Sequence, residues 1–457
     1  MACFCSDNHR SVRSIRSIMG CGSAGLALVF HCACKGPDIG TAPAKNANPI
    51  AQGIKRPTEL IRLAKEGDTF SQVHLAWRFD VGNGVTQDSA EAAYWYKQAA
   101  EMGHSMAQNN YGCLLRDGRG VKRNLKTAAD YFERAARQGN RHAQNNLGWI
   151  FERGSVSEPD LKAAAQWYLR AATPLTDDHG HPFAQNNLGC LYRDGRGVEQ
   201  NHNEAIRWFR LAADQGNHHA FHNLGYMYET GLSVKVDYVE AIRLYAEAAK
   251  LGNLYAMNSL GYVHERGLGV LRDPAAARRW YERAARGGYS MAQNNLATLY
   301  RDGNGIKQDY ILAADWYEKA ALLNNAYAQA TLAWMFEKGN GVKKDYIRAA
   351  DLYRKSAEQG MAVAQIGIGL FHFHGVGVEK NLIESYKWLF IAANSGNERA
   401  GKFCSDLEKE MTDEELDEAK ELALAFVPKP FRSQSDFEPS NPTAPPLGAP
   451  IIDQNPR

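Results

Sequence analysis

The chain has 457 residues, and its 53 Lys and Arg against 51 Asp and Glu give a formal net charge of +2. This balance excludes a strongly basic nucleic-acid binder as the default and excludes an acidic disordered chain. No apolar run of about 18 residues is present, which excludes a multi-span membrane protein. Five of the eight Cys lie in the first 34 residues. The cysteines that remain in the body of the chain are too few for a fold held together by disulfides.

The first 56 residues have the composition of a leader. Three arginines precede an apolar stretch, Ile18–Phe30, and small residues follow it, which is the order found in secretory signals. We therefore expect residues 1–35 to be a signal or leader segment, cleaved after Cys34, and residues 36–56 to be a flexible linker. This predicts export to the periplasm, the envelope or the medium. A lipid anchor on one of the nearby cysteines, or a disordered leader on a cytoplasmic protein, is the alternative.

The body of the chain is an internal repeat marked by glycines. One series of glycines ends the repeats and a second lies in the middle of each, and both advance by 36 residues except for a single step of 41. The first series is Gly67, Gly103, Gly139, Gly180, Gly216, Gly252, Gly288, Asn324, Gly360 and Gly396, in which Asn is the next-best residue for a left-handed helix end. The second series is Gly82, Gly118, Gly154, Gly195, Gly231, Gly267, Gly303, Gly339 and Gly375. Two markers with one period predict nine repeats over residues 68–396.

Each repeat contains two amphipathic helical patterns. The first is A-Q-N-N-L-G-x-x-Y, as at 184–192, and a D-G-x-G-V turn follows it; the second is A-x-x-W-Y-x-x-A-A, as at 164–172. Apolar residues at i, i+3, i+4 and i+7 give each helix one face to bury. Glycine inside the first helix costs about 1 kcal/mol in helix propensity, so close packing has to compensate. Because neither helix buries its face alone, we predict an all-α solenoid of stacked helix-turn-helix units.

Helices outside the repeat are expected at both ends of the array. Residues 57–67 predict an N-terminal capping helix and residues 397–427 predict C-terminal capping helices, in which Thr412 and Glu415 have the spacing of a capping box. Eight of the sixteen prolines lie in the last 30 residues. Residues 428–457 therefore predict a Pro-rich disordered tail.

The 41-residue step places five extra residues around Thr173–His179. Pro174 is expected to end the preceding helix early. The insertion is either a contact loop, a break in the curvature of the array, or a tolerated surface insertion.

The sequence lacks the usual motifs for catalysis and phosphate binding. It has no S-x-x-K, H-E-x-x-H, G-x-x-x-x-G-K-[ST] or C-x-x-C, and its G-x-G pairs recur once per repeat as turns. Six histidines crowd into 44 residues, and His218 and His222 have the i, i+4 spacing of a metal site. No Cys or carboxylate completes a familiar ligand set. We interpret these histidines as a polar helix start and an exposed loop, and we expect no catalytic residue, metal or cofactor.

Three columns of the first helix define a candidate binding face. The first column is Asn109, Asn145, Asn186, His222, Asn258 and Asn294. The second column lies four residues further along each helix and contains Cys113, Trp149, Cys190, Tyr226, Tyr262 and Trp334. The third column lies seven residues further along than the first and contains Arg116, Glu152, Arg193, Glu229, Glu265 and Arg301. An Asn ladder could bond the main chain of an extended peptide, with aromatic rings adding contact area. The adjacent column of Asn110, Asn146, Asn187, Asn223 and Asn295 is interpreted as structural, bonding nearby backbone. A solvated, unoccupied surface is the alternative for the whole face.

These motifs resemble the Sel1-like repeats, a branch of the tetratricopeptide-type helical repeats, over residues 58–426. The resemblance implies an all-α, right-handed superhelix, and a protein that serves as an adaptor or scaffold for other proteins. A cysteine-rich bacterial branch of the family carries a disulfide in each repeat. Cys113 and Cys190 occupy the same repeat position two repeats apart, which does not follow that pattern.

We therefore hypothesise a non-enzymatic scaffold that binds peptide or protein segments on a concave face made by the first helices. One alternative is a metal-dependent or hydrolytic protein that uses the His179–His222 cluster, and another is a structural envelope protein that oligomerises. The expected partners are proteins or peptides rather than nucleic acid. Membrane contact is expected only through a possible N-terminal anchor.

Overall fold

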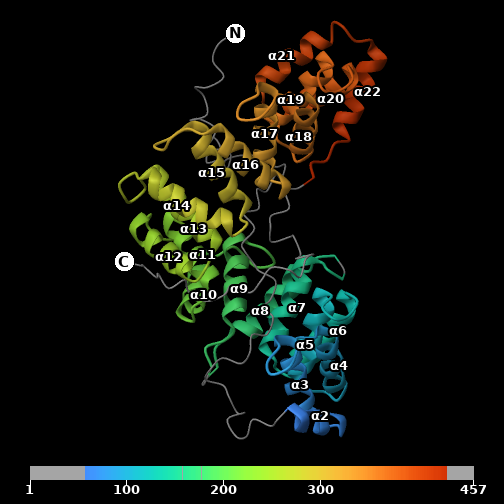
Figure 1. The fold of residues 1–457 in the computed structure, drawn as a ribbon, viewed down its shortest axis with the longest axis vertical. Helices are drawn as coiled ribbons and strands as arrows, with labels where there is room; N and C mark the ends of the chain where they lie inside the picture. The colour runs from blue at the N-terminus through green and yellow to red at the C-terminus, as the bar shows by residue number, and fades with distance from the viewer. Residues whose placement is uncertain (1–56, 157, 176–177, 430–457) are drawn as a thin grey trace, which may run out of the picture. The chain divides into compact units, whose positions relative to one another are not determined.

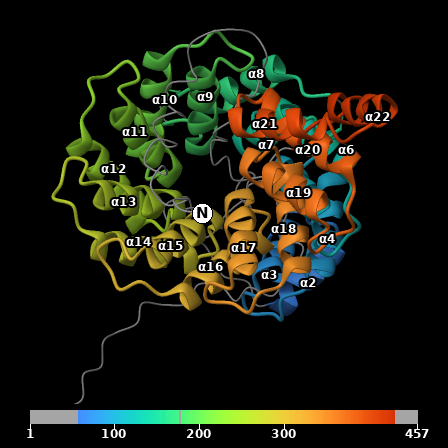
Figure 2. The ribbon, with the colours of Figure 1, turned by 90° about the horizontal axis from the view of Figure 1, so that it is seen from above.

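A computed structural model describes residues 57–156, 158–175 and 178–429 of the chain, and Figures 1 and 2 show two views of it. The described residues form twenty-one α-helices and one isolated β-bridge, between Leu175 and Asp178. The all-α solenoid predicted from the repeat is confirmed. The predicted leader and linker at residues 1–56, and the predicted tail from residue 430 onward, lie outside the described residues.

Eighteen of the helices form nine consecutive pairs, here called repeats 1 to 9, each with a first and a second helix. The first helices are α3 (Thr69–Val81), α5 (Ser105–Asp117), α7 (Arg141–Arg153), α9 (Pro182–Asp194), α11 (His218–Thr230), α13 (Leu254–Arg266), α15 (Ser290–Asp302), α17 (Ala326–Lys338) and α19 (Ala362–His374). The second helices are α4 (Ser89–Glu101), α6 (Leu125–Arg137), α8 (Leu161–Ala172), α10 (His202–Asp214), α12 (Tyr238–Lys250), α14 (Pro274–Arg286), α16 (Tyr310–Leu322), α18 (Tyr346–Glu358) and α20 (Leu382–Asn394). Each helix packs against the helix before it and the helix after it, as Figure 2 shows.

Three further helices flank the repeats. Helix α2 (Pro57–Lys65) precedes repeat 1, while α21 (Glu398–Leu407) and α22 (Asp413–Leu424) follow repeat 9 and pack on α20. The predicted capping box is confirmed, because the Thr412 hydroxyl accepts from the Glu415 amide and the Glu415 carboxylate accepts from the Thr412 amide. No helix of the described part is long and apolar enough to cross a membrane.

Helix ends follow from the repeated cap residues. In repeat 1, Gly82 ends the first helix with φ of 70°, a left-handed value that glycine adopts without strain. The side chain of Asp88 then accepts from the amides of Ala90 and Glu91 at the start of the second helix. Asn324, the one non-glycine of its series, also has a positive φ, of 60°. The glycine ladders are therefore helix stops, as the sequence predicts.

In five first helices, α5, α7, α9, α11 and α13, an interior glycine makes room for an aromatic ring of the second helix of the same repeat. A Cβ on Gly148 would lie 2.7 Å from the Tyr168 ring, and a Cβ on Gly112 would lie 2.7 Å from the Phe132 ring. Both rings are fully buried. The close packing expected to compensate for glycine in a helix is thus the insertion of an aromatic side chain against bare backbone.

Candidate peptide-binding surface on the first helices

The first column of the candidate face is largely occupied by hydrogen bonds between repeats. The Asn146 amide donates to the Asn109 carbonyl oxygen at 2.9 Å, and the Asn187 amide donates to that of Asn145 at 3.2 Å. Asn223 donates to Asn186 at 2.8 Å in the same way. The column interpreted as structural therefore bonds side chains of the preceding repeat rather than nearby backbone.

The members of this first column differ in exposure along the chain. Asn109, Asn145 and Asn186 are buried, at 3%, 1% and 1% exposed. Asn258 and Asn294 are half-buried, although Asn258 also accepts from Asn295 at 2.9 Å. A peptide main chain has access to the second pair and not to the first three, so the predicted Asn ladder remains a prediction for the later repeats.

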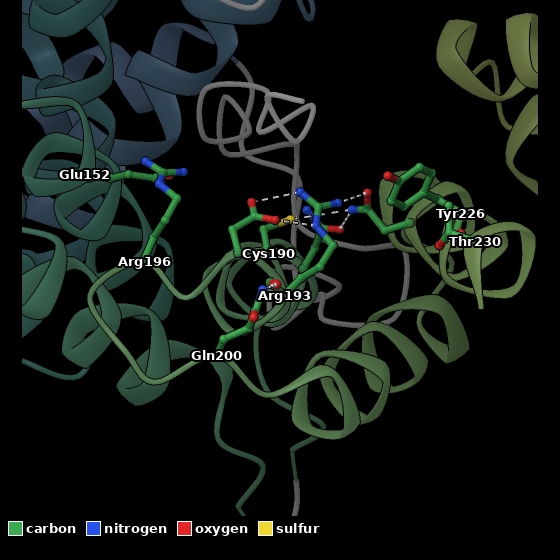
Figure 3. Close-up of polar contacts among 10 residues, drawn as sticks. Glu152, Cys190, Arg193, Arg196, Gln200, Tyr226 and Thr230 are labelled. Carbon is green, nitrogen blue, oxygen red and sulfur yellow. Dashed lines mark hydrogen bonds and ion pairs between the residues drawn. The ribbon is translucent and has the colours of Figure 1, made fainter. Parts of the chain in front are cut away.

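Two R-D-G-R-G segments link consecutive repeats, and Figure 3 shows the one in repeat 4. The guanidinium of Arg193 donates to both carboxylate oxygens of Asp194, at 2.7 and 2.9 Å, and to Asn223 of repeat 5 at 3.3 Å. Arg196 reaches back to Glu152 of repeat 3 at 3.0 Å. One segment of five residues therefore ties three repeats together.

Repeat 2 carries the same arrangement. Arg116 pairs with Asp117 at 2.6 Å, and Arg119 reaches back to Asp80 of repeat 1 at 2.7 Å. Arg116 and Arg193 are each only 7% exposed, whereas Arg301 of repeat 7 is partly exposed and pairs with Asp302 at 2.6 Å. Of the three arginines predicted to line a groove, Arg301 alone has substantial access to solvent.

The aromatic residues of the second column are accessible to solvent. Trp149, Tyr226, Tyr262 and Trp334 are all partly exposed. The Trp149 ring lies 5.8 Å from the Arg116 guanidinium and 5.5 Å from that of Arg153, and Tyr226 lies 5.9 Å from Arg193. Cation–π contact of this kind holds a ring in place before any ligand arrives.

Trp149 also keeps an unused donor. Its indole Nε1 is buried, and the described residues offer it no hydrogen-bond partner. Buried donors usually find a partner, so this N–H is a candidate contact for a carbonyl oxygen of a bound segment or for water.

The cysteines and glutamates of the columns turn inward. Cys113 is buried and accepts from the Asn146 amide at 3.5 Å, and Asn223 approaches the Cys190 sulfur at 3.6 Å. Glu229 accepts from the Tyr245 hydroxyl at 2.6 Å and Glu265 from the Tyr281 hydroxyl at 2.8 Å. These residues stabilise the repeat, which leaves the aromatic members and Arg301 to form the surface.

A glutamine column just before the Asn pair was missed as a functional position. Gln108, at 4% exposed, donates to the Ala100 carbonyl oxygen of the preceding second helix at 3.2 Å. Gln138 donates in turn to the Gln108 side chain at 2.8 Å. The recurrence of Gln in A-Q-N-N was the signal that could have found it, since a polar residue held in a buried register needs a partner.

The clustered histidines separate into distinct contacts. His181 caps α9 by accepting from the Ala184 amide at Nδ1, so its Nε2 carries the proton and donates to His142 at 3.0 Å. His222 packs on the rings of Tyr245 and Tyr255. Burial, aided by His142 and Arg141, lowers the pKa of His181 to about 3. Burial, aided by Arg193 and His218, also lowers the pKa of His222 to about 3.

A metal site does not emerge from this geometry. Between residues 57 and 429, leaving out the three undescribed positions, no group of three or more His, Cys, Asp or Glu is placed to hold a metal ion. The His218 ring lies tilted against the His219 ring, with 4.0 Å between the ring centroids, and its Nδ1 lies 3.0 Å from the Asn253 amide nitrogen. The metal-dependent alternative therefore gains no ligand set from the described residues.

The insertion is held by an arginine from the repeat before it. Helix α8 ends at Ala172, and Arg141 at the start of α7 donates to the carbonyl oxygens of Ala171 and Thr173, both at 2.7 Å. Arg141 also forms an ion pair with Asp178 at 2.9 Å. The insertion is thus fastened to the array on the side where the first helices begin.

Nine stacked helix pairs define a helical repeat protein of the kind typical of protein–protein interaction scaffolds. The Sel1 repeat family matches at residues 69–104, 105–140, 141–173, 182–217, 219–253, 254–289, 290–325, 326–361 and 362–397. The chain belongs to the Sel1 repeat family. The insertion falls in the gap between the third and fourth matches.

Solved structures of the same family are similar to this chain. A protective antigen present in uropathogenic Escherichia coli strains is 31% identical, with 80% of this chain and 85% of that chain covered and a TM-score of 0.45. A Sel1 repeat protein from Oxalobacter formigenes is 32% identical, with 55% and 96% covered and a TM-score of 0.47. No curated protein matches the chain.

Proposed function

We propose that this protein is a non-enzymatic scaffold that binds an extended peptide or protein segment along its first helices. The observation that carries the proposal is the column of partly exposed aromatic rings, Trp149, Tyr226, Tyr262 and Trp334, which occupy one fixed helical position in repeats 3, 5, 6 and 8. Rigid aromatic side chains flanked by arginine are typical anchors of protein interfaces.

The rings are spaced for a segment that runs from repeat to repeat. Trp149 belongs to α7, Tyr226 to α11 and Tyr262 to α13. Tyr226 and Tyr262 lie in consecutive repeats, whereas Trp149 and Tyr226 are separated by repeat 4, which has Cys190 at this position. A bound segment would therefore place an apolar side chain on each ring and leave residues between them to bond polar groups.

Arginines set the preferred chemistry of the segment. Arg153 lies beside the Trp149 ring and Arg266 lies 5.8 Å from the Tyr262 ring. Arg266 is exposed, so its guanidinium is able to meet a carboxylate of the partner. We expect segments that alternate apolar and acidic residues to bind best.

The proposed setting is outside the cytoplasm. The basic and apolar order of the first 35 residues is that of an export signal, and the chain is similar to a protein described as a protective antigen of uropathogenic strains. Fractionation of cells that produce the full-length chain tests this. Recovery of the intact, uncleaved chain in the cytoplasmic fraction would contradict export.

The binding proposal is tested by selecting segments from a random peptide display library with the full-length protein. Trp149→Ala, Tyr226→Ala and Tyr262→Ala combined should weaken binding of the selected peptides by at least about 100-fold, because truncating an aromatic anchor costs about 1–2 kcal/mol or more. The matched control is Tyr94→Ala, which removes a ring that is 54% exposed on α4, a second helix. Helicity by circular dichroism has to be unchanged in both variants.

Two results would oppose the proposal. Equal binding by the triple variant would place the binding surface elsewhere, and equal loss in the Tyr94 control would show non-specific adhesion. Alanine at the buried asparagines does not discriminate, because Asn145 and Asn186 are needed for contacts between repeats.

A further inference from the structure

A second surface lies along the starts of the later second helices. Val239, Ile311 and Ile347 hold the second position of α12, α16 and α18, and they are 68%, 71% and 73% exposed. The same position holds Ala90, Lys126, Lys162 and Asn203 in repeats 1 to 4. Scattered exposed aliphatic residues are ordinary, but this set is confined to the later repeats and recurs at one position.

The surface is continuous from repeat 7 to repeat 9, because each loop rests on the preceding helix start. A Cβ on Gly341 would lie 2.2 Å from the Tyr310 carbonyl oxygen, and a Cβ on Gly377 would lie 2.1 Å from that of Tyr346. A pocket opens between the two elements at the start of α18, lined in part by Tyr346, Ile347 and Val378. We call this surface the helix-start edge. It consists of Ile311, Tyr346, Ile347, Val378, Lys307, Lys343 and Lys344.

The helix-start edge carries positive charge. Lys307, Lys343 and Lys344 are exposed, and the structure shows no ion pair for any of them within the described residues. The nearby Asp309 and Asp345 are occupied as helix caps, each accepting from two backbone amides. Glu379 is the one carboxylate that lines the pocket without capping a helix. The edge therefore combines exposed aliphatic side chains with basic ones.

Helix α22 has the complementary character. Ala419 and Ala423 bury one of its faces, and its other residues expose Asp413, Glu414, Asp417, Glu418 and Glu421 together with Leu422 and Leu424. Leu424 is 76% exposed. This acidic and aliphatic face has no partner among the described elements that would cover it.

Helix α22 cannot cover the helix-start edge of its own chain. The Phe426 ring packs 5.3 Å from Trp388, and the Lys429 amide donates to the Glu358 carbonyl oxygen at 2.8 Å. Glu358 is the last residue of α18, whereas Tyr346 at the pocket is its first. Twelve helical residues separate these ends by about 18 Å, so the C-terminal end of α22 is fixed at the far end of α18.

We propose that two copies of this chain associate, with the acidic face of α22 of one copy seated on the helix-start edge of the other. Leu422 or Leu424 would enter the pocket beside Ile347, and the carboxylates of Glu418 and Glu421 would meet Lys343 and Lys344. Opposite charges on the two surfaces select this pairing and disfavour edge against edge. The contact is heterologous, and it is independent of the aromatic surface proposed for peptide binding.

The test is the mass of the full-length protein by sedimentation velocity over a range of concentrations. Wild type should associate as concentration rises, and high salt should weaken the association. Lys343→Glu with Lys344→Glu, or Glu418→Lys with Glu421→Lys, should each weaken it by at least about tenfold. Mixing the two reversed variants should restore association, because each then offers the charge that the other lacks.

The matched control is Lys122→Glu with Lys126→Glu, which reverses the same kind of loop and helix start in repeat 2, where no exposed aliphatic residue accompanies them. This control should associate like wild type. A wild type that stays monomeric, or an association that both reversals leave unchanged, overturns the proposal. Binding of monomeric wild type to phosphatidylserine vesicles, lost on Lys343→Glu with Lys344→Glu, would also overturn it and assign the edge to anionic lipid.

Discussion

The hydroxyl of Tyr168 donates to the carboxylate of Glu152 at 2.8 Å, across the two helices of repeat 3. Glu152 lies on the first helix and Tyr168 on the second, sixteen residues later. Arg196 of repeat 4 donates to the other carboxylate oxygen at 3.0 Å. One carboxylate thus joins two helices of its own repeat to the loop of the next.

The identity of the aromatic residue follows the charge opposite it. Tyr245, Tyr281 and Tyr353 bond Glu229, Glu265 and Glu337 at 2.6, 2.8 and 3.0 Å. Phenylalanine instead holds the position sixteen residues after an arginine, in the pairs Phe132 with Arg116 and Phe209 with Arg193. Tyr317, opposite Arg301, bonds the Thr298 hydroxyl at 2.8 Å instead. A buried hydroxyl is kept where an acceptor is available to it and is absent otherwise.

Tyr168→Phe should destabilise the protein by about 1–3 kcal/mol, because it leaves the partly buried Glu152 carboxylate without one of its donors. Tyr317→Phe is the matched control and should cost about half as much, since its bond to Thr298 is between neutral groups. Urea unfolding followed by circular dichroism measures both. Equal effects would show that the charge of Glu152 contributes nothing to the bond.

Gly148→Ala should destabilise the protein by about 1–3 kcal/mol, because the added methyl group collides with the Tyr168 ring. Gly401→Ala is the control within a helix, where an added Cβ meets nothing within 4 Å. It should stabilise the protein by up to about 1 kcal/mol through helix propensity. Thermal unfolding of the two variants checks the difference in sign. A neutral Gly148→Ala would show that the ring moves aside freely.

The pH dependence of stability should be reduced in His181→Asn. The pKa of His181 is about 3 in the fold and 6.5 for the exposed side chain, so the unfolded chain binds the proton first as the pH falls. The contribution of neutral His181 is therefore complete above about pH 6.5 and is lost progressively toward about pH 3. Asn keeps the helix cap and cannot titrate.

The measurement is the unfolding free energy of wild type and His181→Asn between about pH 4 and pH 7. The slope of the unfolding free energy against pH should be smaller in the variant, by an amount equivalent to the uptake of up to one proton on unfolding. His222, with a pKa of about 3, continues to contribute to the pH dependence of both proteins. Parallel pH profiles would contradict the placement of His181 as a buried neutral cap.

Arg141→Ala should loosen the insertion without unfolding the repeats. The change removes the bonds to Ala171 and Thr173 and the ion pair with Asp178. We expect faster amide exchange at Leu175 and Asp178, by about tenfold or more, and unchanged exchange in α7. Arg207→Ala, which removes an exposed ion pair with Glu204, is the control and should leave the insertion as it is.

Much of the fold could be predicted from the sequence because its signals are local. Glycine at a fixed spacing stops helices through its access to positive φ, and Ala with aromatic residues at helical spacing gives each helix a face to bury. The family and the solenoid architecture followed from nine repetitions of these signals. Close packing at the interior glycines was also expected, although the aromatic rings that provide it were not.

The candidate site was predictable only in part. The sequence singled out Trp149 and Tyr226, which are partly exposed, but the same argument placed Asn145 and Arg193 beside them, and both are buried. A period of 36 residues identifies equivalent positions without showing how the next repeat covers them. The residue that covers Asn145 is Asn187, which is 42 positions away because of the insertion.

The sequence by itself determined the helices, their ends, their number and the order in which they stack, because these depend on residues close together along the chain. Tertiary structure alone decided which polar columns are consumed by contacts between repeats and which face outward. Asn109 and Asn258 occupy equivalent positions, yet one is buried and the other half-buried. Exposure depends on the side chains that the adjacent repeat brings into contact, and those are set by stacking rather than by local sequence.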